Sequence, residues 1–193
     1  MTIPPLGDSN NRIHPQFLQA GSATGRMASQ NPGVQNIPNK NELGSEIRKS
    51  FIAEKGYKIV SFDYSQIELR IAAFLSGDKK LIEIFKTGQD VHTAVAVEVF
   101  GVKPEEVTKA MRSKAKVINF GVMYGMGVTA LQKNIGTGRD EAQEFLDGYF
   151  NKFSGLAEYL EKIKRETVQK GYTETFFGRR RYFPDIHSKL PFM

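Results

Sequence analysis

The amino-acid sequence predicts an α+β fold in which helices dominate after the first third of the chain. Residues 1–41 are rich in Gly, Pro, Asn, Ser and Gln and have little apolar periodicity, which is typical of loops and short extended pieces. After residue 63, apolar residues recur at helical spacing. Near the C-terminus, "YTETFFGRRRYFP" predicts a β-hairpin that turns near Gly178.

The elements between these segments follow from local patterns. "FIAEKGYKIVSF", residues 51–62, has two β-rich segments around Glu54-Lys55-Gly56 and predicts a hairpin whose second strand ends at Asp63. A helix with apolar residues at Ile67, Ile71, Phe74 and Leu75 is expected to stop at Gly77. Further helices are expected at about 78–86, 91–100, 104–124, 127–134, 138–151 and 155–169, with Pro104 opening the longest of them.

Composition limits the classes of function. The chain has 193 residues, enough for one domain or two small lobes, and its 27 Lys and Arg against 21 Asp and Glu give a charge of +6. This modest excess suits an anionic partner such as a nucleotide or nucleic acid. The absence of Cys excludes disulfides and thiolate zinc sites. No signal sequence or membrane span is apparent, so we expect a soluble, intracellular, cytoplasmic protein.

An unusual passage is "RSKAKVINFGVMYG", residues 112–125, in which cations precede aromatics and glycines. On a helix, Arg112, Lys116, Phe120 and Tyr124 lie four residues apart and share one broad face. Cations can bind phosphates, and a flat ring beside them can stack on a sugar or base. This face therefore has the length and polarity of a nucleotide.

Two features of this helix allow different interpretations. Gly121 and Gly125 would each cost about 1 kcal/mol relative to Ala inside a helix, which favours the close approach of some group to the backbone. Alternatively, the cations, Lys114 included, form a solvated face while Phe120 and Tyr124 belong to the core.

"IVSFDYSQIELR", residues 59–70, places Asp63 between an apolar strand and a helix. A carboxylate at a strand end is a plausible ligand for a hard cation. Alternatively, Asp63 only caps the helix, and Ser65 with Glu68 fits a capping box. From these residues alone both interpretations stay open.

Together the two passages resemble family A DNA polymerases, the bacterial DNA polymerase I type. "DYSQIELR" is similar to their motif A, and Arg112-x3-Lys116-x3-Phe120-Gly121-x2-Tyr124-Gly125 is similar to motif B on the O helix. Other matching segments are "TGRMASQNPGVQNIP" at 24–38, "DVHT" at 90–93 and "FGRRRYFPD" at 177–185. The resemblance covers nearly the whole chain from about Arg12.

The resemblance implies template-directed DNA synthesis, in which a primer 3′-hydroxyl attacks a dNTP with the help of two Mg²⁺ ions. Asp63 would be one of two metal carboxylates, and the Tyr64 backbone carbonyl would also face a metal ion. Arg112 and Lys116 would hold the triphosphate and share the catalytic role with Asp63.

The resemblance also implies the other contacts of the incoming dNTP. His92 and Gln66 would lie near the triphosphate, and Phe120 would pack on the deoxyribose and base. Tyr124 would occupy the templating position while the helix is in its open state. Glu68 would fill the space of a ribose 2′-hydroxyl and would also bond Tyr124, with the capping box as the rival role.

Primer-template DNA is the second implied partner. Arg26, Gln35 and Asn36 would contact it near the minor groove, together with Tyr124. For Arg70 and the run Arg179–Arg181 a structural salt bridge or a phosphate contact is the simpler interpretation. We expect His14 and His187 to be surface residues.

The resemblance divides the chain into a partial palm with motif A, residues 1–70, and a fingers subdomain, residues 71–193, with the O helix at about 111–124. The second metal carboxylate, which the family carries in a His-Asp-Glu motif C, is not found, and neither is the thumb. We therefore expect a fragment that is inactive alone, or one half of a split polymerase whose partner chain supplies thumb and motif C. The alternative is a non-catalytic protein that binds nucleotides or nucleic acid.

Overall fold

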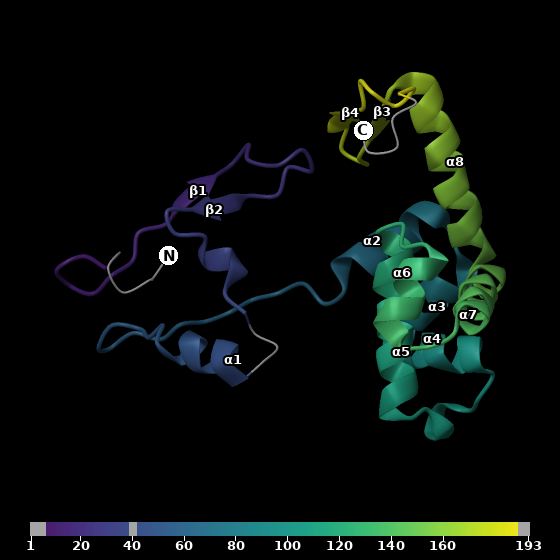
Figure 1. Cartoon of the computed structure of the whole chain (residues 1–193), viewed down its shortest axis with the longest axis horizontal. Coiled ribbons are helices and arrows are strands. Elements are labelled where there is room, and N and C mark those ends of the chain that lie inside the picture. Colours follow the sequence, from purple (N-terminus) through teal and green to yellow (C-terminus); the bar gives the residue numbers. More distant parts are fainter. Residues whose placement is uncertain (1–6, 39–41, 189–193) are drawn as a thin grey trace. The chain divides into compact units, whose positions relative to one another are not determined.

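A computed structural model of the chain describes residues 7–38 and 42–188 (Figure 1). This part of the chain contains eight α-helices and two sheets of two strands each. The predicted α+β fold with dominant helices is therefore confirmed. No described helix is long and apolar enough to cross a membrane.

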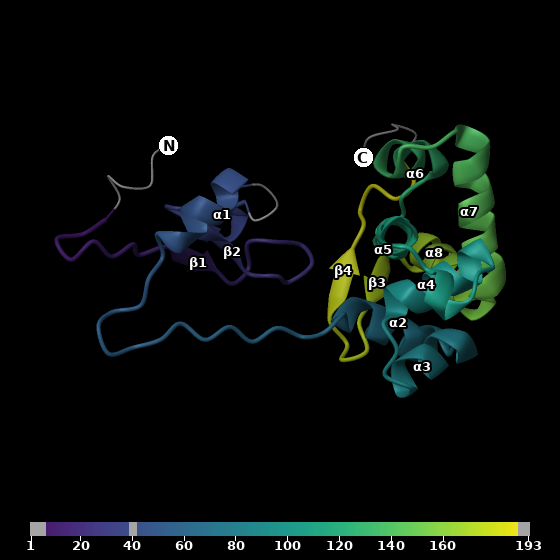
Figure 2. The ribbon, with the colours of Figure 1, turned by 90° about the horizontal axis from the view of Figure 1, so that it is seen from below.

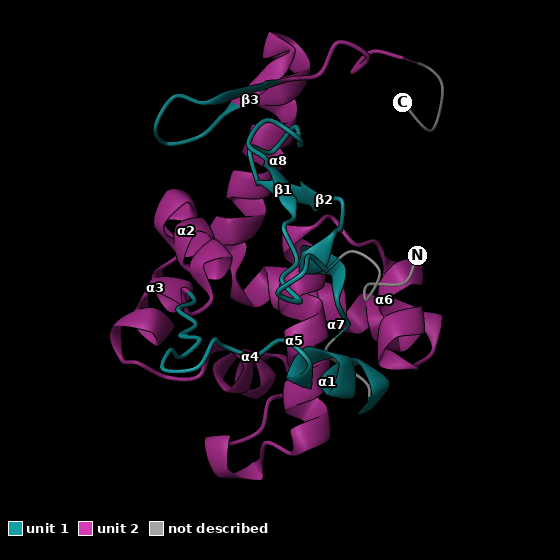
Figure 3. Cartoon of the chain, turned by 90° about the vertical axis from the view of Figure 1, so that its left-hand side faces the viewer, with its two compact units in different colours: residues 1–63, 174–181 teal, residues 64–173, 182–193 magenta. Residues whose placement is uncertain are grey.

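The chain divides into two compact units (Figure 3). Unit 1 comprises residues 1–63 and 174–181, and unit 2 comprises residues 64–173 and 182–193. The division follows Asp63 rather than residue 70, and the assignment of palm and fingers to the two parts stays a prediction.

Unit 1 contains the short extended pieces that the N-terminal composition predicts. Strand β1 (Gln16–Leu18) pairs antiparallel with β2 (Ala28–Gln30), with Phe17 opposite Ser29. A 3-10 helix, η2 (Val34–Asn36), follows. The prediction for residues 1–6 and 39–41 lies outside the described residues.

The structure adds a helix that the sequence analysis missed, α1 (Glu42–Lys49). Its first turn contains Glu42 and its last turn contains Arg48 and Lys49. This charge order suits the helix dipole, which favours acids at the N-terminus and bases at the C-terminus. This charge order is the sequence signal from which α1 could have been predicted.

The predicted hairpin at residues 51–62 is wrong. A turn is present, closed by the Tyr57 N–H on the Glu54 carbonyl at 2.9 Å, but no strand forms on either side. Ile59, Val60 and Phe62 are exposed, so these β-prone residues have no surface to pack on. Because strand propensity reflects packing and pairing rather than a backbone preference, it produces no strand here.

Unit 2 is a helical body (Figure 2). Its helices are α2 (Ile67–Ser76), α3 (Lys79–Lys86), α4 (Val91–Phe100), α5 (Lys109–Met123), α6 (Val128–Ile135), α7 (Arg139–Lys152) and α8 (Ser154–Lys170). Helix α4 packs against both α5 and α7. Large side chains that are fully buried form the core: Leu69, Leu81, Val91, Val95, Ile118, Leu131, Tyr149, Phe153 and Leu156.

The helix expected at 104–124 is two elements. Pro104 begins a 3-10 helix, η3 (Pro104–Glu106), after which the chain extends at Val107. The Thr108 hydroxyl accepts the Met111 N–H at 3.2 Å and caps α5. A Thr three residues before a free helix donor is a strong signal for a helix start. Thr108 therefore sets the start of α5, and Pro104 begins only the short η3.

The buried carboxylate of Asp78 links two helices of unit 2, α3 and α8. Asp78, only 4% exposed, accepts the N–H groups of Lys80 and Leu81 at the start of α3. Its second oxygen accepts the Leu156 N–H at 3.2 Å, near the start of α8. A single side chain therefore satisfies the first turns of two helices that are far apart in sequence.

The predicted C-terminal hairpin is confirmed. Strand β3 (Tyr172–Glu174) pairs with β4 (Arg180–Tyr182). The Thr175 N–H donates to the Arg179 carbonyl at 2.8 Å, and Gly178 has φ +84° in the turn. Glycine adopts this left-handed conformation without steric cost, which explains its place there.

Candidate nucleotide-binding site

Helix α5 presents the four predicted nucleotide-binding residues as the spacing suggests. Arg112 and Lys116 are exposed, Phe120 is half-buried, and Tyr124 is the C-cap of the helix with 64% of its surface exposed. The alternative in which both aromatics belong to the core is therefore wrong for Tyr124. A face with cations at one end and an accessible phenol at the other remains.

The middle of this face rests on a buried polar pair. The ring of Phe120 lies 5.8 Å from that of His92, centroid to centroid, with the rings tilted by 45°. His92 is buried, and its Nδ1 is 3.1 Å from Nδ2 of Asn119. Burial lowers the pKa of His92, and the charges of Arg112 and Lys116 lower it further, against the opposing effect of Asp90. His92 thus packs against Phe120 as a largely neutral ring.

Glu68 pairs with Tyr124, as the family resemblance suggests. The Tyr124 hydroxyl donates to Oε2 of Glu68 at 2.8 Å, which joins α2 to the end of α5. The rival capping box is wrong: the N-cap of α2 is Gln66, in the left-handed conformation, and no side chain caps the helix. Gln66 is half-buried, and its carbonyl accepts the Arg70 N–H.

The two glycines, Gly121 and Gly125, take part in the cap at the C-terminal end of α5. Gly125 has φ +69°, and its N–H donates to the Val122 carbonyl, while the Met126 N–H donates to the Gly121 carbonyl. This pair of bonds is a Schellman motif, which requires a residue with positive φ just after the helix. A Cβ on Gly121 would lie 3.0 Å from Sδ of Met126. The group that approaches the backbone is therefore the chain's own Met126.

Arg112 has an intramolecular partner. Its Nε and Nη2 donate to Asp90 at 3.2 and 2.6 Å, and Asp90 also accepts the Thr93 N–H as the N-cap of α4. Burial raises the pKa of Asp90, but the bonds from Arg112 and Thr93 outweigh it and lower that pKa to about 2. The same pair raises the pKa of Arg112. Both side chains are charged at neutral pH.

This pair predicts a pH effect on stability. The folded-state pKa of Asp90 lies below its ordinary value of 3.8, so the ionised carboxylate stabilises the fold above about pH 4. That contribution is lost as pH falls towards about 2. Asp90→Asn, which cannot ionise, should therefore differ most from wild type above about pH 4 in urea unfolding.

The pH dependence of wild type alone would not isolate Asp90, because Asp8 is protonated in the same pH range. Its pKa is also about 2, through its bonds with His14 and the Arg12 backbone. Asp8→Asn is the matched control and should leave the Asp90 difference intact. A wild-type minus Asp90→Asn difference that stays constant from about pH 5 to about pH 2 would contradict the role of the ion pair.

Two lysines of α5 have different surroundings. Lys116 is exposed on the same face as Arg112. Lys114 is half-buried, lies 3.7 Å from Glu141 and sits over the ring of Phe145 on α7. Lys114 is therefore committed to helix packing, and this makes it a natural control for Lys116.

The predicted metal ligands are not part of a complete site. Asp63 is exposed at the end of unit 1, and Tyr64 is exposed at the start of unit 2. No group of three or more His, Cys, Asp or Glu residues gathers within the described ranges. The described residues thus do not fit an Mg²⁺ pair by themselves, and the metal roles of Asp63 and Tyr64 stay predictions.

The predicted DNA contacts gather in unit 1. Arg26, Gln35 and Asn36 are exposed around the β1–β2 hairpin and η2. Gln35 donates through Nε2 to the Met27 carbonyl at 3.2 Å, and its N–H donates to the Ser29 hydroxyl. These contacts keep η2 against β2.

The remaining predicted residues are structural or lie on the surface. Arg70 makes no salt bridge among the described residues; it donates to the Ser65 carbonyl and lies over the Phe85 ring. Arg180 forms the expected ion pair, with Glu174 at 2.5 Å. His14 and His187 are exposed, as predicted.

Sequence reasoning missed Asp90 and Asn119. Asp90 stands in the quoted "DVHT", and Asn119 is the one polar residue inside the apolar run of α5, so each carried a local signal. The Oδ1 atom of Asn119 is buried and has no hydrogen-bond partner within the described part of the chain.

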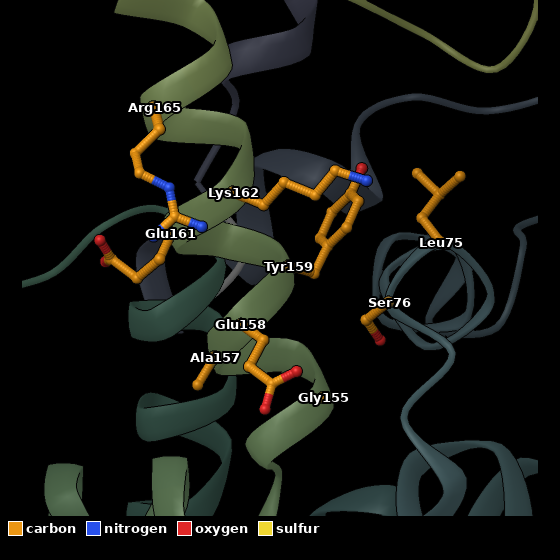
Figure 4. Close-up of a pocket in the computed structure, with 9 residues that line it drawn as sticks. All are labelled: Leu75, Ser76, Gly155, Ala157, Glu158, Tyr159, Glu161, Lys162 and Arg165. Carbon is orange, nitrogen blue, oxygen red and sulfur yellow. The ribbon is translucent and has the colours of Figure 1, made fainter.

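A hollow lies elsewhere, between α2 and α8 (Figure 4). Its volume is about 690 Å³, and acidic and basic side chains both line it, among them Glu158, Lys162 and Arg165. None of the predicted site residues borders it. The nucleotide-binding candidate is thus an open face of α5 and not this hollow.

Comparisons with known proteins bear on these assignments. The sequence profile of DNA polymerase family A matches residues 2–191. The chain is 46% identical over 192 residues to the thermostable DNA polymerase I of Thermus aquaticus, covering 97% of this chain and 23% of the relative. It is 48% identical over 184 residues to DNA polymerase I of Pseudomonas aeruginosa, covering 95% of this chain and 20% of the relative.

A solved structure is also similar, the POL domain of Pol1 from M. smegmatis in complex with DNA primer-template and dNTP. Its TM-score is 0.88 at 39% sequence identity, and the match covers 97% of this chain and 33% of that chain. The chain spans about a fifth to a quarter of the length of the two curated relatives. Since the family profile covers nearly all of its residues, this chain belongs to DNA polymerase family A.

Proposed function

We propose that this chain provides the dNTP-binding face of a DNA polymerase and acts in template-directed DNA synthesis by nucleotidyl transfer to a primer 3′-hydroxyl. The observation that carries the proposal is the face of α5, where exposed Arg112 and Lys116 precede Phe120 and Tyr124. The order of groups along this face, charge first and rings next, matches the order of triphosphate, sugar and base in a dNTP.

Each part of the face has a chemical task. Arg112 and Lys116 bind the triphosphate through charge-assisted hydrogen bonds, which are about twice as strong as neutral ones. Phe120 packs on the sugar and base, and His92 beneath it limits the ring's freedom to turn away. Stacking on an aromatic ring is tolerant of base identity, as templated synthesis requires.

The Tyr124 end of this face discriminates deoxyribose from ribose. Glu68 is held by the Tyr124 hydroxyl at 2.8 Å, so its position beside the ring of Tyr124 is fixed. In our proposal this carboxylate occupies the space that a ribose 2′-hydroxyl would need. Primer-template DNA is the proposed partner of the surface formed by Arg26, Gln35 and Asn36.

The proposal is tested by restoring a polymerase around this chain. The aligned segment of the Pseudomonas aeruginosa DNA polymerase I is replaced by this chain, and primer extension is measured with dNTPs and Mg²⁺. We expect extension by the chimera and its loss in Asp63→Ala, the proposed metal carboxylate. Asp185→Asn, a second exposed carboxylate, is the control and should extend as the chimera does.

The outcome is informative only for a folded chimera, so its thermal unfolding is compared with that of the parent enzyme. A folded chimera that binds dATP but does not extend the primer would overturn synthesis and favour a non-catalytic nucleotide-binding protein. Extension that survives Asp63→Ala would remove Asp63 from the reaction.

A further inference from the structure

The carboxylate of Asp90 makes two kinds of contact. Its Oδ1 accepts the Thr93 N–H at 2.7 Å and so caps α4. The same oxygen accepts Nε of Arg112 at 3.2 Å, and Oδ2 accepts Nη2 at 2.6 Å. Asp90 therefore fixes Arg112, on α5, to the first turn of a helix whose second residue is His92.

The atoms that Asp90 engages decide what Arg112 can still bind. A guanidinium has five N–H donors in a rigid plane. Asp90 uses the edge formed by Nε and Nη2. Two donors on Nη1 and one on Nη2 remain. One donor from each of these nitrogens forms the free edge, which matches two oxygens of a phosphate.

We propose that Asp90 is a positioning residue for nucleotide binding: it holds Arg112 by one edge of the guanidinium and presents the other edge to the triphosphate. This inference rests on the proposed function, since it assigns Arg112 to the triphosphate. Arginine has a long side chain with many rotamers, and fixing it before binding reduces the entropy lost when the phosphate arrives.

A second effect of Asp90 opposes the first, because its negative charge repels the phosphates. The pair lies at the surface, with side-chain exposures of 46% for Arg112 and 37% for Asp90. Salt screens repulsion there, with a Debye length of about 8 Å at about 0.15 M salt. The two direct hydrogen bonds that hold Arg112 are 2.6 and 3.2 Å long, so salt weakens them less than it weakens the longer-range repulsion between Asp90 and the phosphates. Positioning therefore dominates at and above that ionic strength.

The test separates the ion pair from the helix cap. Asp90→Ser keeps a side-chain oxygen that can cap α4, since Ser is a good N-cap, but loses the carboxylate for Arg112. Binding of dATP and of inorganic tripolyphosphate is measured by calorimetry at about 0.15 M and about 0.3 M salt. The proteins are wild type, Asp90→Ser, Arg112→Ala and the double variant.

We expect Asp90→Ser to weaken binding of both ligands by about 3- to 10-fold, which lies in the range of coupling between residues in contact. In the Arg112→Ala background the same change should have no further effect. Asp90→Asn keeps the cap and one acceptor for Arg112, so it should fall between wild type and Asp90→Ser. Because Asn is also a good N-cap, this variant serves if Asp90→Ser does not fold.

Three results would overturn the inference. If Arg112→Ala weakens binding while Asp90→Ser binds as tightly as wild type, or more tightly, Asp90 does not position Arg112 and the proposed function stands. If Asp90→Ser weakens binding equally in the Arg112→Ala background, Asp90 does not act through Arg112. If Arg112→Ala itself has no effect, Arg112 leaves the proposed site, and the positioning role falls with it.

Discussion

Replacement of Lys116 by Ala is expected to weaken the binding of dATP to this chain by about 10- to 150-fold. Lys116 is exposed on the face of α5 that also contains Arg112, so its ammonium is available to a phosphate. Loss of one charge-assisted contact costs about 1.5 to 3 kcal/mol, and each 1.4 kcal/mol corresponds to about tenfold in affinity. Titration calorimetry at about 0.15 M salt measures the change.

Lys114→Ala is the matched control for this prediction. It removes the same charge from the same helix, but Lys114 lies beside Glu141 and over Phe145. We expect Lys114→Ala to bind dATP within about twofold of wild type, because a charge away from the ligand is screened by salt. Equal losses in the two variants would show that only net charge matters, and equal affinity in wild type and Lys116→Ala would remove Lys116 from the site.

The second large effect concerns stability. Asp78→Ala is expected to lower the free energy of unfolding by about 2 to 4 kcal/mol. Asp78 is buried and accepts N–H groups at the starts of both α3 and α8. One N-cap typically contributes about 1 kcal/mol, and a buried donor left without a partner costs about 1 to 3 kcal/mol. Urea unfolding followed by circular dichroism measures the loss.

Thr108→Ala is the control for Asp78→Ala. Thr108 caps α5 alone and is exposed, so its loss should cost only about 1 kcal/mol. Asp78→Asn keeps one acceptor oxygen and should fall between the two. If Asp78→Ala were no less stable than Thr108→Ala, the bond to Leu156 would contribute nothing to the junction of α3 and α8.

The positions of most helices follow from local patterns and were predictable from the sequence. Apolar spacing identified α2 to α8, and glycine marked the turn between β3 and β4. These features depend on neighbours within about one helical turn, which the sequence contains directly. The strands expected at residues 51–62 failed for the opposite reason, because a strand depends on a partner that local sequence does not specify.

For the candidate site, the sequence by itself determined which groups α5 can offer. A spacing of four residues places Arg112, Lys116 and Phe120 on one helix face whatever packs around it. The pairing of Glu68 with Tyr124 came from the family resemblance and not from spacing, since the local pattern favoured a capping box.

Only the tertiary structure decided what these groups contact. Arg112 is held by Asp90, His92 lies under Phe120, and Met126 fills the space beside Gly121. Asp90 and His92 belong to α4 and its cap, and the contact with α5 depends on how the two helices pack. Hydrogen bonds and close contacts require sub-ångström placement of both partners, and that placement results from the packing of the core rather than from the pattern of either helix.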